Sequence, residues 1–295
     1  MKRKLIKQGG GGFTFYLPKK WADKRGLKAG DEISLREVKD SLIINGTDLR
    51  KKEISSKDVN MTTAYEFLLA AHINGFDKIT IKTKDPKLKK EIERVVDGFL
   101  LGFEIISKDE KVVIENVAEP TDKFENIVRR LWLMIKELER RIGSEQIKDF
   151  EQEKVKLDKY ATFCMRTIMQ GSKEDHNLDI YWDVINALYK LQHSYVYLLR
   201  YSNEVKVSEI LKKHLNKVHN NFQSIYEIFY KGSVMEALEI SESLFKQFKN
   251  IDKDIEKSKG KESVKLAHMK HIIRSAHILA SEVADMKMER KIQEL

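Results

Sequence analysis

The sequence predicts a multidomain α+β protein: a small strand-rich region, then a small α/β unit, then an all-α region of six helices. All three prolines, Pro18, Pro86 and Pro120, lie in the first 120 of 295 residues, and proline is rare inside helices. After Pro120, apolar residues recur at three- and four-residue steps, as in amphipathic helices. Short strand-like runs and glycine-rich turns fill the start instead. We therefore expect domains at 1–50, 54–118 and 120–295.

The first region reads as two hairpins around one helical turn. A turn of helix is expected directly after Pro18, over 19–24. Strand-like runs separated by glycine-containing turns occupy 4–7, 12–17, 32–38 and 41–45. Fifty residues with four short strands are near the lower limit for an independent hydrophobic core. We therefore expect this region to pair with a second copy.

The middle region alternates helices and strands. A helical pattern from 58 to 74 ends at Gly75, and Asp85-Pro86 has the cap and first residue of a helix that runs to about 101. Strand-like runs occupy 78–82, 104–107 and 111–116. The last two are joined by Asp109-Glu110, which suggests a hairpin closing a small α/β unit.

The last region predicts six long helices, delimited by polar breaks and by Gly143, Gly171, Gly232 and Gly260. Their expected ranges are 121–142, 145–170, 178–202, 206–231, 233–258 and 262–293. Apolar stripes on successive helices joined by short loops favour antiparallel packing. The six helices therefore form one large bundle or two three-helix bundles.

Positive charge is concentrated at the N-terminus. The chain carries a net charge of +9, and residues 1–30 contain nine basic side chains and one acidic side chain, Asp23. Such a concentration of positive charge is expected of a surface that binds a polyphosphate backbone or an anionic membrane. The alternative is a charged surface that contacts only solvent. The run is interleaved with Gly, Phe, Tyr and Pro, so the pattern favours a nucleic-acid surface over a solvated helix face.

Several classes of protein are not expected. No apolar run approaches the roughly 20 residues that span a bilayer, and the start lacks the apolar stretch of a signal peptide, so we expect a cytoplasmic protein. Cys164 is the single cysteine and cannot form an internal disulfide or a thiolate zinc cluster alone. Its apolar helical context predicts a raised pKa. No hydrolase, metalloprotease or P-loop motif occurs, and we expect no enzymatic activity.

The N-terminal segment carries a series of short motifs: Arg3-Lys4-Leu5, the turn at 9–12, Leu17-Pro18-Lys19, and Gly26-Leu27 followed by Gly30-Asp31. The combination covers about 45 residues and resembles the SpoVT/AbrB/MazE swapped-hairpin family. The resemblance implies an interlaced homodimeric β-barrel that contacts double-stranded DNA. The expected DNA-contacting residues are Lys2, Arg3, Lys4, Lys7, Lys19, Lys20, Lys24 and Arg25.

The order of the later pieces carries a second resemblance. The runs 73–79 (INGFDKI), 102–104 (GFE) and 129–131 (RRL), placed after a swapped-hairpin segment, make nearly the whole chain similar to the archaeal PhoU-related phosphate uptake regulators. This resemblance implies a helical domain built as two three-helix repeats. It also implies a dimeric transcription regulator of phosphate uptake and homeostasis, with helices that sense or relay phosphate status through phosphate transporter components or a signalling protein.

The helical region offers weak candidates for a metal site. PhoU proteins often carry a Glu-x-x-x-Asp-x-x-Asp pattern on the third helix of each repeat. Glu282 and Asp285 match its last two acids, whereas the corresponding stretch of the first repeat, 189–196, has no carboxylate. His268 and His271 are spaced to share one helix face, although isolated helical histidines are more often packing residues. An ion held here would be iron, zinc or magnesium.

Two other functions remain open at this stage. The chain is alternatively a metal-binding PhoU-type adaptor that docks on a phosphate transporter or a sensor kinase, with the N-terminal region serving to dimerise. It is alternatively an antitoxin-type protein that neutralises a toxin, since the same swapped-hairpin fold serves that role. The acidic series Glu236, Glu239 and Glu242 reads as a solvated stripe because lysines lie nearby.

Overall fold

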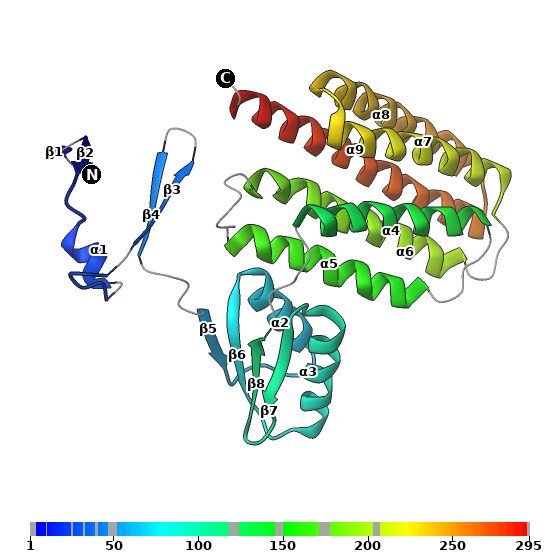
Figure 1. Ribbon diagram of the computed structural model, residues 1–295. Helices are drawn as coiled ribbons and strands as arrows, with labels where there is room; N and C mark the ends of the chain where they lie inside the picture. The colour runs from blue at the N-terminus through cyan, green and yellow to red at the C-terminus, as the bar shows by residue number, and fades with distance from the viewer. Residues whose placement is uncertain are drawn as a thin grey trace. The chain divides into compact units, whose positions relative to one another are not determined.

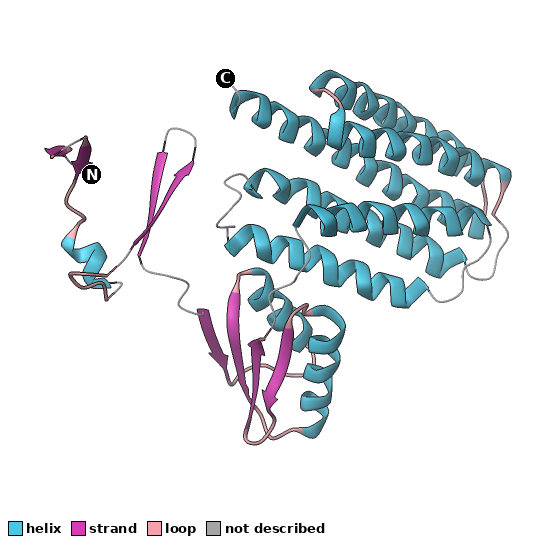
Figure 2. Ribbon diagram, in the orientation of Figure 1, coloured by secondary structure: helices cyan, strands magenta, loops and turns pink. Residues whose placement is uncertain are grey.

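The computed structural model describes residues 4–9, 11–24, 26–31, 33–38, 41–46, 52–117, 124–144, 150–170, 178–202 and 207–293. It is mostly helical, with small sheets near the N-terminus and a helical C-terminal region (Figures 1 and 2). The chain divides into two compact units, Met1–Lys51 and Lys52–Leu295. Each unit is described by itself.

The first unit contains two antiparallel hairpins and a short helix. Strands β1 (Ile6–Gln8) and β2 (Gly12–Thr14) pair with Lys7 opposite Phe13. Helix α1 (Lys19–Lys24) follows Pro18, as the sequence predicts. Strands β3 (Ile33–Val38) and β4 (Ser41–Gly46) pair with Leu35 opposite Ile44. The first two strands are shorter than the runs predicted for them.

Hydrogen bonds explain the glycine-rich motif after α1. The amide of Leu27 donates to the carbonyl of Ala22 over 3.0 Å and that of Gly26 to the carbonyl of Asp23 over 3.0 Å. This is the Schellman arrangement, and Gly26 adopts the positive φ of 65° that it requires. The Asp31 carboxylate then accepts from the amide of Lys28 over 2.8 Å, which closes the following turn.

The second unit begins with a four-stranded sheet in the order β5-β6-β8-β7. Its elements are β5 (Lys52–Ser56), α2 (Ala64–Ile73), β6 (Phe76–Lys82), α3 (Pro86–Phe99), β7 (Phe103–Ser107) and β8 (Lys111–Asn116). Strand β5 is parallel to β6, and the other two pairs are antiparallel. Both helices bury the same face of the sheet, which presents Ile79, Ile81 and Ile114 to them.

The ends of these elements follow local hydrogen bonds. The Asp85 carboxylate accepts from the amide of Lys87 over 2.9 Å, so α3 begins where Asp85-Pro86 predicts. The prediction that a helix begins at 58 is wrong, because the side chain of Asn60 accepts from the amides of Thr62 and Thr63 and holds a turn before α2. Strand β5 was not predicted at all.

The helical region contains the expected helices with shifted ends. They are α4 (Phe124–Ser144), α5 (Phe150–Gln170), α6 (Trp182–Ser202) preceded by a short 3₁₀ turn η1 (Leu178–Tyr181), α7 (Glu209–Lys231), α8 (Val234–Lys257) and α9 (Lys261–Gln293). Gly232 is the C-cap of α7, as predicted. Within the described ranges, none of the helices is both long enough and apolar enough to cross a bilayer.

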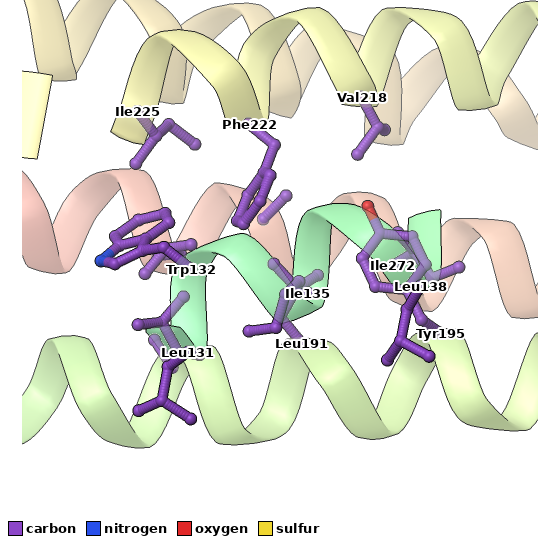
Figure 3. Close-up of a cluster of buried hydrophobic side chains, with 14 of the residues drawn as sticks. Leu131, Trp132, Ile135, Leu138, Leu191, Tyr195, Val218, Phe222, Ile225 and Ile272 are labelled. Atoms are coloured by element: carbon purple, nitrogen blue, oxygen red, sulfur yellow. The ribbon is translucent and has the colours of Figure 1, made fainter. Parts of the chain in front are cut away.

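The helices pack around one continuous hydrophobic core. Helices α4, α5 and α6 contact one another, α7, α8 and α9 contact one another, and α6 lies along α9. Figure 3 shows where the two sets meet, with Trp132 of α4 close to Phe222 and Ile225 of α7. The helical spacing of five aromatic residues predicts that they pack in the core. Trp132, Tyr195, Phe222 and Phe229 have at most 3% of their surface exposed, whereas Trp182 is only partly buried.

Candidate functional site

The basic residues predicted to contact DNA lie on exposed positions of the first unit. Lys7 is on β1, while Lys19, Lys20 and Lys24 are on α1. Lys4 precedes β1, and the side chains of all five residues are exposed. Lys2, Arg3 and Arg25 lie outside the described residues. The five described lysines are therefore accessible to a polyanion.

The turn between β1 and β2 is the glycine run that the sequence predicts as a hairpin turn. Gly9 and Gly11 have φ values of 50° and 117°, and the amide of Gly11 donates to the carbonyl of Gly9 over 2.7 Å. Side chains other than glycine are strained in such conformations. A Cβ atom built at either position would meet no other atom within 4 Å, so the backbone here is open to close approach.

Large apolar side chains of the first unit are uncovered. Their exposed fractions lie between 43% and 75%, at Leu5, Ile6, Phe13, Tyr16, Leu35 and Leu42. None of the side chains described in this unit is buried. On the β3–β4 hairpin, Leu35 and Ile44 are opposite each other, so the apolar side chains share a face. A unit of this kind gains its hydrophobic stabilisation only when another surface covers that face.

The metal candidates lie at two separate places on α9. His268 is half-buried beside Tyr201, with the ring centroids 5.6 Å apart, and burial lowers its pKa, with His271 adding to the effect. Glu282 is fourteen residues further along the helix, or about 21 Å at the α-helical rise. One ion therefore cannot join the histidines to the acids.

Glu282 and Asp285 of α9 lie close to a further carboxylate, Asp183 of α6. Burial raises the pKa of Glu282, and the charges of Asp183 and Asp285 raise it further. Even so, among the residues that the structure describes, no three His, Cys, Asp or Glu side chains are grouped closely enough to hold a metal ion.

A buried carboxylate on α5 was not identified from the sequence. Asp158 has no exposed surface. It accepts from Lys154 Nζ over 2.5 Å and from Gln192 Nε2 over 2.6 Å, and His193 Nε2 lies 2.9 Å from it. Burial acts to raise the pKa of this carboxyl, but the hydrogen bonds from His193 and Lys154 outweigh it and the pKa lies below its ordinary value. Asp158 is therefore a buried anion held by α5 and α6.

Two tyrosines extend this polar cluster to the α/β unit. Tyr65 of α2 and Tyr189 of α6 lie within electrostatic reach of each other and of Asp158. Burial, together with the charge of Asp158, raises the pKa of Tyr65 to about 12. The ring of Tyr65 also meets that of Phe99 edge-on at 5.0 Å. Side chains from α2, α3, α5 and α6 thus meet around Asp158.

Three side chains of α5 form hydrogen bonds with the ends of α2 and α3 and with the start of β6. Lys159 Nζ donates to the carbonyl of Asp97 over 2.8 Å, and Thr162 Oγ1 donates to that of Phe99 over 3.4 Å. Arg166 donates to the carbonyls of His72 and Phe76 over 2.9 and 2.8 Å, and to the Asp77 carboxylate. Cations at helix C-termini complement the helix dipole. Helix α5 therefore belongs to the bundle and also caps the α/β unit.

Two buried groups near α5 are packing residues. Burial lowers the pKa of His72 to about 3, with the charges of Arg166 and Lys159 adding to the effect, so its ring is neutral. Its ring meets that of Phe103 edge-on at 5.1 Å. Cys164 is fully buried, and burial raises the pKa of its thiol, as the sequence predicts.

A second buried carboxylate joins α4, α6 and α7. Glu139 accepts from the hydroxyl of Tyr195, and His219 Nδ1 lies 2.8 Å from its other oxygen. Burial raises the pKa of Glu139, although the hydrogen bonds from Tyr195 and His219 oppose the rise. The folded protein therefore holds a proton on Glu139 at a pH where the unfolded chain has released it.

Because the pKa of Glu139 is raised, we expect the free energy of unfolding to depend on pH, and we expect Glu139→Gln to remove this dependence. Because the folded state binds the proton more tightly, the free energy of unfolding falls as pH rises from 4.5, the ordinary pKa of this group, to the pKa in the folded protein. Urea unfolding of both proteins from pH 4 to pH 8 measures the difference. The advantage of the wild type over Glu139→Gln is expected to shrink as pH rises, and a constant difference would contradict this assignment.

Comparison of the chain with protein-family models, with curated proteins and with solved structures finds no match.

Proposed function

We propose that this protein is a dimeric DNA-binding transcription regulator of phosphate uptake and homeostasis. Its first unit dimerises as a swapped-hairpin domain and binds promoter DNA. Its helical region is a PhoU-like pair of three-helix repeats that senses or relays phosphate status. The specific link to phosphate rests on the resemblance of the sequence to the archaeal regulators.

One observation carries the DNA-binding part of the proposal: exposed lysines and uncovered apolar side chains occur together on the first unit. Lys7 on β1 is opposite Phe13 on β2, so basic and apolar side chains share a hairpin. A second copy that covers the apolar face of the β3–β4 hairpin, at Leu35, Leu42 and Ile44, leaves the lysines of α1 outside that contact, where two symmetric basic surfaces face a duplex. Twofold symmetry of the protein predicts a palindromic or pseudo-palindromic operator.

In this proposal the helical region relays phosphate status to the first unit through the α/β unit. Helix α5 packs against α4 and α6 in the bundle and against α2 and α3 in the α/β unit. Its hydrogen bonds to the ends of α2 and α3 hold the two parts together, so a rearrangement of α5 moves both. The allosteric step is a change in the bundle that shifts the geometry of the two DNA-binding halves.

DNA binding is tested by replacing two adjacent lysines of α1. Lys19→Ala combined with Lys20→Ala is expected to weaken binding and to lower the slope of log K against log salt by about one for each phosphate contact removed. Fluorescence anisotropy on the full chain, across a salt series, measures both quantities. The probes are DNA from upstream of its own gene, DNA from upstream of neighbouring phosphate-transport genes, and a random duplex.

The matched control is a second pair of adjacent lysines. Lys212 and Lys213 lie on α7, and replacing both with alanine is expected to leave the affinity and the slope unchanged. Equal losses in the two double variants would mean that net charge alone drives binding. No preference for the upstream DNA over the random duplex at any salt concentration would overturn the regulator proposal.

A further inference from the structure

Helix α8 carries an outward stripe that changes sign at its midpoint. Its buried side chains include Ala237, Leu244 and Ile251, and at 3.6 residues per turn the opposite side of the helix is the exposed stripe. The residues of this α8 stripe are Met235, Leu238, Glu239, Glu242, Phe245, Lys246, Lys249 and Lys253, all exposed. Two acids come first and three lysines follow; Glu256 and Lys257, which are also exposed on this side, lie beyond them at the end of the helix.

The α8 stripe also exposes more apolar surface than a solvated helix face needs. Met235, Leu238 and Phe245 have 64%, 45% and 41% of their surface exposed. Lys249 Nζ lies 4.3 Å from the centre of the Phe245 ring, and Lys246 pairs with Glu242 over 2.7 Å. Apolar side chains bordered by charges of both signs are typical of a surface that meets another protein.

We propose that the α8 stripe pairs with the α8 stripe of a second copy of this chain, in antiparallel orientation about a twofold axis near Leu244. In this register Glu242 faces Lys246 of the second copy and Glu239 faces Lys249. The twofold axis repeats each pair. Phe245 lies beside the axis, and Met235 covers the methylene stem of the second copy's Lys253.

The order of charges selects this orientation. A parallel pair of α8 helices in register would place the acids against acids and the lysines against lysines, which is destabilising. An antiparallel pair places each acid against a lysine and leaves no like charges opposed. A polyanion or an anionic membrane would meet the acidic half of the stripe. A second copy of α8 is therefore the occupant whose charges match along the whole stripe.

This surface is separate from the apolar faces of the first unit, and the proposal does not rest on DNA binding. If the first units of two chains also pair, they hold the two α8 stripes close together. The resulting high effective concentration strengthens a weak α8 contact within the same dimer. If the two twofold axes differ, the α8 contact joins dimers into larger assemblies.

The first test is disulfide trapping in the full chain. Cys164 is buried, so introduced cysteines report alone. Differently tagged chains carrying Met235→Cys and Lys253→Cys are co-expressed and oxidised with copper phenanthroline. The expected product is a covalent heterodimer, because these positions face each other. Neither variant alone is expected to cross-link at a comparable level, since position 235 does not face itself.

The matched control pairs Lys253→Cys with Lys213→Cys, which is exposed on α7. Its cross-linking gives the background from copies that are merely close together. A yield for positions 235 and 253 that is no higher than this background would overturn the proposal, whatever the DNA-binding result. Failure of DNA binding with the 235–253 cross-link intact would overturn the regulator proposal and leave the α8 pairing standing.

The second test uses charge segregation. Glu239→Lys with Glu242→Lys makes positions 239, 242, 246 and 249 all basic, and Lys246→Glu with Lys249→Glu makes the same four positions all acidic. Each form is expected to lose the 235–253 cross-link when co-expressed with itself. The two forms co-expressed together are expected to regain it, because every facing pair is again opposite in sign. Circular dichroism checks that the helix content of both variants is unchanged. Failure of the mixed pair to cross-link would contradict the antiparallel register.

Discussion

Replacing Arg166 with alanine is expected to lower the free energy of unfolding of the second unit by roughly 3–5 kcal/mol. The side chain is 3% exposed and donates to the carbonyls of His72 and Phe76 and to the Asp77 carboxylate. Its guanidinium also stacks 4.9 Å from the centre of the Phe103 ring. Alanine removes the donors but leaves the acceptors in place, so they lose partners that water cannot fully replace.

The measurement is urea unfolding of the full chain followed by circular dichroism. Arg140→Ala is the matched control, because Arg140 is also a helical arginine in a bidentate pair, with Glu137, but is largely exposed. Its loss is expected to cost at most about 1 kcal/mol. Arg166→Lys should fall between the two, since lysine keeps the charge and loses the planar fork. Equal effects at positions 140 and 166 would contradict the role of Arg166 as the attachment of α5 to the α/β unit.

The order of elements could be predicted because it depends on local signals. The spacing of apolar residues predicts the long helices. Asp85-Pro86 predicts the start of α3 because the hydrogen bond involved joins Asp85 to Lys87, only two residues away. Gly232 similarly marked the end of α7. Signals of this kind act over a few residues and are visible in a single sequence.

The elements that were missed depend on tertiary contacts. Strand β5 has only five residues, KEISS, and little apolar character. It is a strand because β6, some twenty-five residues later, offers a parallel partner. The start of α2 was placed too early because Asn60 competes for the backbone amides that a helix would use. Local propensity says little about either outcome.

The polar clusters could not be predicted for the same reason. The stretch 189–196, which carries Tyr189 and His193, has no carboxylate of its own. The carboxylate beside His193 is Asp158, which comes from the preceding helix. Arg166 likewise reaches Asp77, 89 residues away in sequence. A single sequence shows the period of a helix but not which helix lies against it.

The separation of the metal candidates, in contrast, follows from the sequence once one helix is accepted. Two residues fourteen positions apart on a straight helix are about 21 Å apart, so His268 and Glu282 cannot share an ion. What the sequence did not indicate is that Asp183, at the start of α6, lies close enough to raise the pKa of Glu282.

Replacing Asp158 with alanine is also expected to destabilise the second unit by roughly 3–5 kcal/mol at pH 7. The variant leaves Lys154, Gln192 and His193 without the acceptor that they share. It also removes the anion around which α5 and α6 meet Tyr65 of α2. Glu151→Ala is the matched control on the same helix, because Glu151 pairs with Arg200 in an exposed position and its loss is expected to cost at most about 1 kcal/mol.

The pH dependence separates the charge of Asp158 from its packing. The pKa of Asp158 in the folded protein lies below its ordinary value of 3.8, so the stability that its charge contributes is complete above 3.8 and is lost as pH falls toward the pKa in the folded protein. The difference between wild type and Asp158→Ala in urea unfolding should therefore be constant from pH 7 to about pH 5 and narrow below pH 4. A difference that stays constant into the acid range would mean that packing alone accounts for the loss.

Hydrogen exchange at α2 adds a second readout. If Asp158 helps to join the bundle to the α/β unit, the amides of α2 exchange faster in Asp158→Ala, and their exchange rates stay unchanged in Glu151→Ala.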